Sequence, residues 1–398
     1  MNKLKKIEYL VGSKISENIS LEPYNEKILD FLSDLSKVLN LNKSSKNFPD
    51  VITLAFYCRK QNLLNLKNKF LVKSKRLGLG LLFHITPSNI PTNFAYSLLF
   101  GLLTGNSNTV KVPTKKFDQI DIICKSIKKV LNVKKYSSLK NMISIIRYNS
   151  EDNEEITRKI SEECDARIIW GGDKTINQIR KIPIKARTVD IPFPDRYSLC
   201  VINSNEIFKL DKIKLNSLVN KFFNDTYIVD QNACSSPQLI YWTGNKNKEA
   251  KNIFWRSLQD IVKKKYAPPS LAAIDNYTNL CSYLINLKNL KYYNIYDKSI
   301  YVIGLKKINL ETNSLRGKWG FFFEYESNNF NNILNLVDKK CQTLTYFGFK
   351  KKFFEEFIDI QKPKGIDRIV PIGQALDINL NWDGYDINTL LSREIIIK

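Results

Sequence analysis

The chain has 398 residues, 43% hydrophobic and 12% aromatic, which is enough apolar material for two cores. Its formal net charge of +23 is compatible with an anionic ligand, but the lysines are spread over the whole length, which disfavours a dedicated nucleic-acid surface. The seven cysteines are scattered and His84 is the single histidine, so neither a disulfide framework nor a metal site is expected.

The N-terminus begins with basic residues, but no apolar run follows them, so it does not have the pattern of a signal peptide. The most apolar region, residues 77–104, is interrupted by prolines, asparagines and a histidine, and is too broken to cross a bilayer. We therefore expect a cytoplasmic protein without a transmembrane segment.

Hydrophobic periodicity predicts an amphipathic helix over residues 24–40 and a second helix that begins at Pro49. From residue 77 onward, short apolar segments alternate with amphipathic ones. This alternation predicts a parallel sheet with helices on both faces and functional residues on loops at the carboxyl ends of its strands. The predicted strands are 79–85, 109–112, 142–146, 166–170 and 197–202, and the predicted helices are 91–103, 118–131, 153–163 and 173–181.

A second segment opens with a helix and runs from about residue 206 to 350. The run Tyr266-Ala-Pro-Pro-Ser270 reads as a loop inside it, and its predicted elements include a helix over 247–264 and strands at 300–303 and 320–326. The C-terminal portion, residues 342–398, also looks folded, with a predicted strand at 369–372.

Residues 230–238, Asp-Gln-Asn-Ala-Cys-Ser-Ser-Pro-Gln, set Cys234 among small polar residues between two apolar segments. A thiol in such a turn can lie at a helix N-terminus, where free N–H groups favour the thiolate. The thiolate attacks carbonyl carbon, so Cys234 is a candidate nucleophile. The alternative is a half-buried structural cysteine.

Two loops after predicted strands carry further candidates. In the loop over 84–91, prolines flank Asn89, whose carboxamide could donate to an oxyanion, although asparagine is also a common turn residue. In the loop over 170–176, Gly171 and Gly172 let the backbone approach a ligand, and the next helix could offer its N–H groups to a phosphate. Asp173 could instead serve only as the N-cap of that helix.

A third loop, residues 110–116, contains lysines that could meet the ribose or 2′-phosphate of a nucleotide, or could simply be solvated at the start of a helix. Gly78-Leu-Gly80 is not a dinucleotide fingerprint, because it does not follow the strand.

Taken together, these loops and the cysteine resemble the aldehyde dehydrogenase superfamily. More closely, the chain resembles the bacterial acyl-CoA reductase family of the bioluminescence fatty acid reductase (LuxC-type). The likeness covers roughly residues 50–398. The matching runs are 84–91, 96–106, 170–173, 194–198, 230–238, 342–348 and 365–377, continuing to 382–386.

The resemblance implies an α/β, aldehyde-dehydrogenase-like fold with two open α/β domains. We expect residues 1–204 to form N-terminal helices and a Rossmann-like NADP-binding domain, and residues 205–365 to form the catalytic domain with the nucleophilic cysteine. Residues 366–398 are expected to serve packing or oligomerisation. A homo-oligomer is expected only because proteins of this family commonly form one.

The resemblance also implies NADPH-dependent reduction of a long-chain acyl-CoA or acyl-protein thioester to a fatty aldehyde. Cys234 falls on the acylated cysteine of the family, and Asn89 on the oxyanion asparagine of the superfamily. The expected cofactor-binding residues are Lys111, Pro113, Lys115, Gly171, Gly172 and Asp173.

Three departures from the superfamily bear on these expectations. Val112, and not a lysine, directly precedes Pro113, while Lys115 stands where NAD-preferring relatives place glutamate and would favour the 2′-phosphate of NADPH. The water-activating Glu-Leu-Gly-Gly segment is missing from residues 187–195, where Asp190 is the nearest carboxylate, and this loss favours reduction over aldehyde oxidation. Glu324 is a candidate for the glutamate that contacts the nicotinamide ribose in relatives.

The expected mechanism is acyl transfer to Cys234 and then hydride transfer from NADPH, with a thiohemiacetal that collapses to the aldehyde. Asn89 and the Cys234 backbone N–H are expected to hold the oxyanion. His84 is either a satisfied strand-end histidine, which we favour, or a group that tunes this site. An acyl-protein synthetase or acyltransferase is an expected partner by resemblance, and nucleic acid is not. The alternatives are a fatty aldehyde dehydrogenase working in the oxidative direction and a catalytically silent basic binding protein.

Overall fold

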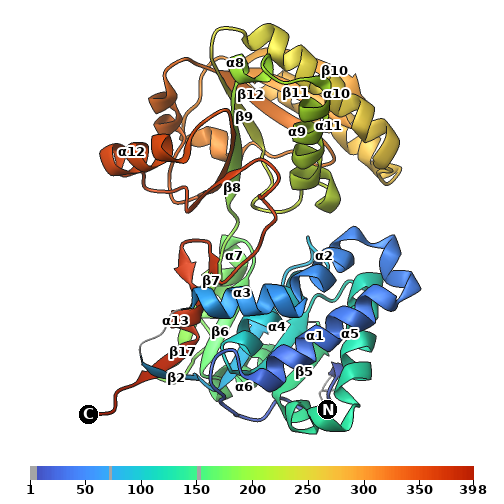
Figure 1. The fold of residues 1–398 in the computed structure, drawn as a ribbon, viewed down its shortest axis with the longest axis vertical. Coiled ribbons are helices and arrows are strands. Elements are labelled where there is room, and N and C mark those ends of the chain that lie inside the picture. Colours follow the sequence, from blue (N-terminus) through green and yellow to red (C-terminus); the bar gives the residue numbers. More distant parts are fainter. Residues whose placement is uncertain (1–6, 71–73, 150–153) are drawn as a thin grey trace. The chain divides into compact units, whose positions relative to one another are not determined.

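The computed structural model describes residues 7–70, 74–149 and 154–398, which form two compact units (Figure 1). Unit 1 comprises residues 1–195 and 379–398, and unit 2 comprises residues 196–378. The structure therefore divides the chain differently from the expected boundaries. Residue 204 lies at the start of the helix α8 (Ser204–Ile207) of unit 2, and the expected C-terminal segment is shared between the units.

Unit 1 is built on a six-stranded sheet with the strand order β1-β5-β4-β3-β6-β7. The five strands from β3 to β7 are parallel, and β1 pairs with β5 in the antiparallel direction. The chain leaves β3 towards β4 on one side and later places β6 on the other side. The boundary between β3 and β6 is therefore the topological switch point, where open α/β sheets bind ligands. The strands are β1 (Glu8–Val11), β3 (Leu81–Ile85), β4 (Ser107–Val112), β5 (Ile143–Arg147), β6 (Ala166–Trp170) and β7 (Val189–Phe193).

Two helices of unit 1 begin at residues that commonly start helices. The Asn25 side chain accepts a hydrogen bond from the Lys27 N–H at the start of α1, and Pro49 occupies the first turn of α2. Both helices were predicted from periodicity, and both are confirmed. The helices are α1 (Glu26–Leu41), α2 (Pro49–Tyr57), α3 (Lys60–Lys69), α4 (Asn93–Leu103), α5 (Asp118–Leu131), α6 (Glu154–Glu163) and α7 (Asp173–Arg180), with short 3-10 turns at Lys43–Asn47 and Lys134–Met142.

The last twenty residues return to unit 1 and are tied to it by hydrogen bonds. The Tyr24 hydroxyl donates to the Asn388 side chain over 3.0 Å, and the Asn106 amide donates to the Leu391 carbonyl over 2.9 Å. The elements of this return are β15 (Asn381–Trp382), β16 (Tyr385–Asp386), α13 (Ile387–Leu390) and β17 (Ser392–Ile395), which pairs with β2 (Lys75–Gly78).

Unit 2 is built on a seven-stranded sheet with the order β10-β11-β12-β9-β8-β13-β14. All neighbouring strands are parallel except β10, which pairs with β11 in the antiparallel direction. The strands are β8 (Tyr197–Asn203), β9 (Leu239–Thr243), β10 (Leu290–Asp297), β11 (Ile300–Leu305), β12 (Phe321–Glu326), β13 (Cys341–Phe347) and β14 (Arg368–Pro371). The longer helices are α9 (Lys212–Thr226), α10 (Asn247–Lys265), α11 (Leu271–Asn286) and α12 (Lys351–Gln361), with 3-10 turns at Tyr227–Val229, Leu310–Ser314 and Phe330–Asn335.

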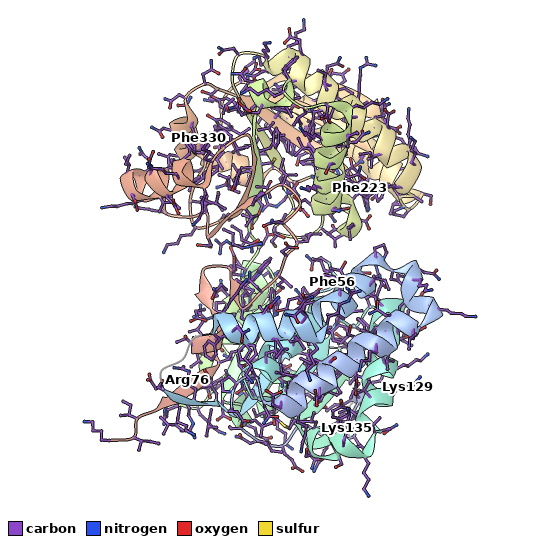
Figure 2. All side chains as sticks on the ribbon, in the orientation of Figure 1. Phe56, Arg76, Lys129, Lys135, Phe223 and Phe330 are labelled. Atoms are coloured by element: carbon purple, nitrogen blue, oxygen red, sulfur yellow. The ribbon has the colours of Figure 1, made fainter. Side chains whose placement is uncertain are left out.

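Both faces of the sheet in unit 2 are covered by helices, as the alternating pattern requires. One buried cluster joins α9 and α10 to the sheet and includes Phe223, and the other joins α11 and α12 to the opposite face, where Phe330 packs against it (Figure 2). Neighbouring residues of a strand serve opposite clusters, because successive side chains point to opposite faces. Phe322 of β12 thus belongs to the first cluster and Phe321 to the second.

The sequence located β3 to β6 and α4 to α7 to within two residues, although residue 153 of the predicted third helix lies outside the described residues. It assigned β8 to the first domain, and this was wrong. β8 pairs with β9 and β13 and is a central strand of unit 2. No helix in the described ranges is both long and apolar enough to span a bilayer.

Candidate functional site

Three loops of unit 1 meet at one edge of its sheet. They follow β4, β3 and β6, which are adjacent strands that run in the same direction. The loop after β3 carries Asn89, the loop after β4 carries Lys115, and the loop after β6 carries Gly172. The structure thus brings the predicted oxyanion loop and the two predicted cofactor loops of unit 1 together at the topological switch point.

The two candidate lysines of the second loop differ in exposure. Lys111 is buried, its Nζ lies 5.2 Å from the centre of the Tyr148 ring, and burial lowers its pKa to about 8. Its carbonyl accepts hydrogen bonds from Thr86, at 3.2 Å from the N–H and 2.8 Å from the hydroxyl. Lys111 therefore anchors the start of the Asn89 loop through its main chain. Lys115 is exposed, with its Nζ 5.0 Å from the centre of the Phe117 ring, and it is the lysine that a ligand can reach.

Pro113, between these lysines, is buried, and its carbonyl accepts a hydrogen bond of 3.3 Å from Arg147 Nε. Because proline fixes its own backbone angle, this contact holds the turn that leads from β4 to Lys115. Pro113 therefore shapes the loop.

The third loop turns directly into helix α7. Gly172 is the N-cap and Asp173 is the first helical residue, so Asp173 is not the N-cap that the sequence allowed. A Cβ atom at Gly171 would lie 3.2 Å from the Thr175 Cβ, whereas at Gly172 it would meet no described atom within 4 Å. The open backbone at Gly172 and the N–H groups of the first helical turn suit a phosphate group.

His84 lies beneath these loops in the middle of the sheet. The Trp170 indole N–H donates to Ser97 Oγ over 3.0 Å, and Ser97 Oγ lies 2.7 Å from His84 Nδ1. Because Asn108 Oδ1 can only accept, Nε2 carries the proton and donates to it over 2.9 Å. In the neutral ring, Nδ1 therefore accepts from the Ser97 hydroxyl. Gly101 leaves the space that Asn108 Oδ1 occupies, since a Cβ there would lie only 1.7 Å from it. His84 is thus a satisfied, neutral histidine, as favoured from the sequence, and burial lowers its pKa to about 4.

Asp190 lies on β7 directly opposite Arg167 of β6. The fully buried guanidinium donates to both carboxylate oxygens, at 2.7 Å from Nε and 2.8 Å from Nη2. Such a two-point pair in a buried setting makes Asp190 the counter-ion of Arg167. This carboxylate is committed to a structural role in unit 1.

Cys234 lies in unit 2, half-buried, in the turn between a 3-10 helix (Tyr227–Val229) and β9. The element that follows it is a strand, so the expected helix N-terminus does not exist and cannot favour a thiolate here. The loop begins with Asp230 and Gln231 in the left-handed region, at φ of 53° and 59°. It lies at the amino ends of β8 and β9, because the Gln238 N–H donates to the Ser198 carbonyl over 2.9 Å.

The main chain at Cys234 is held from β8 and from α9. The Ser198 hydroxyl donates to the Cys234 carbonyl over 2.6 Å and accepts from the Thr343 N–H over 3.1 Å. On the other side of the loop, the Ser236 hydroxyl donates to the Asp225 carbonyl over 2.7 Å. These bonds fix the peptide groups that flank the thiol.

The Gln231 side chain is the second brace of the loop. It is buried, and its carboxamide makes four hydrogen bonds to main-chain groups. Its oxygen accepts from the N–H groups of Gly320 and Phe321, each at 3.1 Å, while its nitrogen donates to the carbonyls of Pro237 at 3.1 Å and Phe321 at 3.0 Å. The Cys234 loop is thereby joined to the start of β12.

A third brace links this region to the chain after β14. The buried Asp225 carboxylate accepts from the N–H groups of Gly373 at 2.6 Å and Ala375 at 2.9 Å, and burial raises its pKa to about 7. Arg368 donates to the Ala375 carbonyl at 3.0 Å from the opposite side. Sequence reasoning did not assign roles to these braces, although the matching runs contain most of them. The unassigned residues are Ser198, Asp225, Gln231, Gln238 and Arg368.

Glu324 does not fit the suggested contact with a nicotinamide ribose. It is 1% exposed on β12, and its carboxylate accepts hydrogen bonds from the Trp255 indole and, over 2.6 Å, from the Tyr292 hydroxyl. Lys251 Nζ lies 3.3 Å from the same carboxylate. These neighbours enclose the charge inside unit 2, so the suggestion is not retained.

Comparison with known proteins decides the relationship. The family profile described as Acyl-CoA reductase (LuxC) matches residues 21–393. The chain belongs to this family.

Curated relatives in the acyl-CoA reductase (LuxC) family are distant from this chain. The long-chain acyl-protein thioester reductase of Photorhabdus laumondii is 23% identical over 303 residues, and that of Vibrio harveyi is 21% identical over 298 residues. Each match covers 74% of this chain and 58% of the relative, so the chain spans less than two thirds of the length of the curated relatives it matches.

Solved structures confirm the aldehyde-dehydrogenase-like fold that the family implies. The 1-pyrroline-5-carboxylate dehydrogenase from Thermus with bound NAD superimposes with a TM-score of 0.62 at 10% identity, over 92% of this chain and 80% of that chain. Aldehyde dehydrogenase 21 of Physcomitrella patens gives a TM-score of 0.58 at 13% identity, over 88% and 77% of the two chains. At these identities the likeness shows the fold alone.

Membership of the acyl-CoA reductase (LuxC) family implies a nicotinamide cofactor. The residues of unit 1 are suited to bind such a cofactor. The fit rests on the open backbone at Gly172, the helix that begins there and the exposed cation of Lys115. Across the described ranges, no group of three or more His, Cys, Asp or Glu residues could hold a metal ion.

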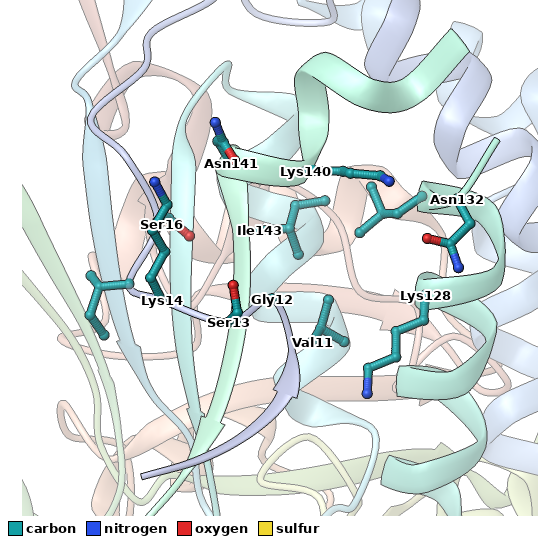
Figure 3. Close-up of a pocket in the computed structure, with 12 residues that line it drawn as sticks. Val11, Gly12, Ser13, Lys14, Ser16, Lys128, Asn132, Lys140, Asn141 and Ile143 are labelled. Atoms are coloured by element: carbon teal, nitrogen blue, oxygen red, sulfur yellow. The ribbon is translucent and has the colours of Figure 1, made fainter. Parts of the chain in front are cut away.

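A pocket of about 280 Å³ lies elsewhere in unit 1 (Figure 3). It is found at the amino end of β5, between the segment Val11–Ser16 and the end of α5, and Lys14, Lys128 and Lys140 line it. Because the predicted oxyanion loop and the two predicted cofactor loops lie at the carboxyl ends of the strands, this pocket is at the opposite edge of the sheet, and none of the predicted site residues lines it.

Proposed function

We propose that this member of the acyl-CoA reductase (LuxC) family reduces a long-chain acyl thioester, either acyl-CoA or acyl-protein, to the fatty aldehyde with NADPH. The proposal rests on the surroundings of Cys234, which is a half-buried thiol in a turn whose main chain is held by hydrogen bonds from Ser198 and Gln231. A nucleophile needs this combination of access and fixed position.

The other cysteines support this choice. Five are buried, and burial raises the pKa of each of these thiols above its ordinary value, which disfavours the reactive thiolate. Cys281 is partly exposed, but it lies in the middle of helix α11. Of the two accessible thiols, only Cys234 lies in a braced loop. The five buried cysteines are Cys58, Cys124, Cys164, Cys200 and Cys341.

In the proposed first step, the Cys234 thiolate forms a bond to the thioester carbonyl carbon, and the carbonyl electrons move to the oxygen. The Asn89 carboxamide and the Cys234 N–H donate to that oxyanion, in the role that such donors have in acyl transfer. When the carbonyl re-forms, the bond to the leaving thiolate breaks, and an acyl group remains on Cys234. The braces on either side of the turn keep the Cys234 N–H directed while the charge moves.

In the second step, a reduced nicotinamide bound to unit 1 would supply a hydride to the acyl carbonyl carbon. The carbonyl oxygen then carries the negative charge of a thiohemiacetal alkoxide on Cys234; as the carbonyl re-forms, the carbon–sulfur bond breaks, and the aldehyde leaves with the Cys234 thiolate regenerated. No water has to be activated. Asp190 is the paired counter-ion of Arg167, and this agrees with a reaction that proceeds by reduction.

The cofactor is proposed to bind at the switch point of unit 1. Its phosphates would meet the backbone around Gly171 and Gly172 and the first turn of α7 at Asp173, and the exposed Lys115 would meet the 2′-phosphate of NADPH. Lys111 and Pro113 would support the loop from below. A cytoplasmic location, a homo-oligomer and a synthetase or acyltransferase partner that delivers the acyl group belong to the same proposal.

The test is NADPH consumption and aldehyde formation by the purified protein with tetradecanoyl-CoA. We expect turnover in the wild type, its loss in Cys234→Ala, and its retention in Cys281→Ala, the matched control at the other partly exposed cysteine. Equal loss in both variants, or full activity of Cys234→Ala, would rule out Cys234 as the nucleophile. Irreversible formation of free acid from the aldehyde with NADP⁺ would instead support an oxidative dehydrogenase.

A further inference from the structure

Helix α11 has apolar residues on its outer side as well as its inner side. It buries Ala272, Asn276 and Leu280 against unit 2. Leu271, Ile274, Tyr277 and Ile285 lie on the opposite side of the helix, because they are separated by three, three and eight positions. Their side chains are strongly exposed, at 56%, 64%, 61% and 81%.

Strand β10 lies at the edge of the sheet of unit 2 (Figure 1) and carries further exposed apolar residues. Tyr293 and Ile295 are about half exposed and lie opposite Ile303 and Tyr301 of β11. Both of these β11 residues belong to the buried cluster that includes Leu280 of α11, so β10 presents Tyr293 and Ile295 on the face that α11 covers. We call the six residues the α11 surface, and they are Leu271, Ile274, Tyr277, Ile285, Tyr293 and Ile295.

The helix part and the strand part of the α11 surface lie on the same face of the sheet, because Leu280 of α11 packs in the same buried cluster as Tyr301 and Ile303 of β11. The α11 surface therefore has a helical part and an edge-strand part on one face of unit 2. An apolar area of this kind on a water-soluble unit marks a site of contact with another surface.

Exposed lysines border the α11 surface at three places. Helix α11 itself carries one acidic residue, Asp275, and no basic residue. Lys318 borders the helix, because the carbonyl of its neighbour Trp319 accepts a hydrogen bond of 3.3 Å from Asn276 of α11. Lys288 is exposed two positions after the helix ends, and Lys298 is exposed at the end of β10.

The bordering lysines favour one binding partner of the α11 surface over another. A second copy of the chain would place one lysine-rich rim against another, and like charges brought together oppose binding. An anionic lipid surface attracts basic residues, at about 1 kcal/mol for each one near the headgroups. Tyrosine, leucine and isoleucine side chains can enter the boundary between headgroups and acyl chains.

We propose that the α11 surface docks the protein on an anionic lipid bilayer. The aliphatic and tyrosine side chains of α11 and β10 enter the interfacial layer, and the surrounding lysines contact the anionic headgroups. This docking is independent of the proposed reductase chemistry, because Cys234 and the cofactor loops take no part in it.

The test is co-sedimentation of the full chain with lipid vesicles. One set contains phosphatidylcholine alone, the other phosphatidylcholine with phosphatidylglycerol, and each is measured at low and high salt. We expect binding to the anionic set that weakens as salt rises, and the double variant Ile274→Ser/Ile285→Ser to bind about tenfold less because two large apolar side chains are lost. The matched control is Ile213→Ser, at an isoleucine of α9 that is equally exposed, at 82%, and outside the α11 surface.

Three results would overturn the proposal. They are a wild-type protein that binds neither vesicle set, a double variant that binds as well as Ile213→Ser, and equal binding to neutral and anionic vesicles. Light scattering tests the other possible occupant of the α11 surface, which is a second copy of the chain. If the wild type is a dimer that ignores vesicles and the double variant is a monomer, the α11 surface is an interface between copies. Thermal denaturation of the variants checks that each is folded.

Discussion

The hydroxyl of Ser198, the second residue of β8, donates a 2.6 Å hydrogen bond to the Cys234 carbonyl. The same hydroxyl accepts from the Thr343 N–H of β13 at 3.1 Å. Ser198→Ala removes both bonds, one to a buried main-chain N–H and one to a partly buried main-chain carbonyl. We expect the free energy of unfolding to fall by about 2 kcal/mol. We also expect kcat to fall more than KM rises, because the peptide beside the nucleophile loses its support.

Urea unfolding and steady-state NADPH consumption measure these two effects. Ser314→Ala is the control, because Ser314 is exposed and its hydroxyl donates only to the nearby Glu311 carbonyl in the described structure. Unchanged stability and kcat in Ser198→Ala would show that the hydroxyl does not brace the nucleophile loop.

The Arg167–Asp190 pair predicts a large effect on stability from a residue that resembles a catalytic carboxylate. Asp190→Ala leaves the fully buried Arg167 guanidinium without its counter-ion. The expected loss in the free energy of unfolding is about 3–5 kcal/mol, measured by urea denaturation. The double variant Arg167→Met/Asp190→Leu should recover much of it, because the unpaired charge is gone. A stable Asp190→Ala protein that has lost only activity would assign Asp190 to the chemistry.

The buried His84 ring predicts a specific loss of stability in acid. Its pKa in the folded chain is about 4, below the ordinary 6.5, because burial disfavours the imidazolium. The neutral ring contributes stability that is fully present above about pH 6.5 and is lost as the pH falls towards 4. Between about pH 7 and about pH 5 this amounts to about 2 kcal/mol.

His84→Gln isolates this contribution, because His84 is the single histidine of the chain. The free energy of unfolding is measured for both proteins across the pH range. The wild type should lose more stability than the variant as the pH is lowered. Parallel curves for the two proteins would contradict a neutral, buried His84.

The exposed Lys115 is expected to determine the preference for NADPH over NADH. Lys115→Glu replaces an exposed cation by an anion, which repels the 2′-phosphate of NADPH and can accept from the ribose hydroxyls of NADH. We expect the KM for NADPH to rise about tenfold and the preference to move towards NADH. Lys116→Ala, at the exposed neighbouring lysine, is the control. If the ratio of kcat/KM for the two cofactors does not change in Lys115→Glu, the 2′-phosphate is held elsewhere.

The local elements of unit 1 could be predicted closely from the sequence because each has its own periodic signal. Helix α5 and strand β6 were located to the residue, over 118–131 and 166–170. The grouping of strands into sheets was harder to predict, because sheet membership depends on pairing between distant segments. The strand at Tyr197–Asn203 follows the alternating pattern of unit 1, yet it pairs with β9 and β13 of unit 2.

The candidate site shows the same limit. Cys234, Asn89 and the cofactor loops could be named from their local surroundings and the family resemblance, and their roles stay predictions. The sequence allowed a helix N-terminus at Cys234, but the chain continues from this turn into the buried strand β9. Glu324 looked available in an aromatic run, but strand alternation directs it to the face of β12 that α10 covers, where Trp255 and Tyr292 enclose it.

The most direct test of the proposed reaction is mass spectrometry of the protein after incubation with tetradecanoyl-CoA in the absence of reductant. We predict one acyl adduct, located on the peptide that contains Cys234, absent from Cys234→Ala and retained in Cys281→Ala. Addition of NADPH should remove the adduct and release tetradecanal. If no adduct forms with acyl-CoA or with an acyl-protein donor, or if the adduct forms on another cysteine, Cys234 is not the nucleophile and the proposed reaction is wrong.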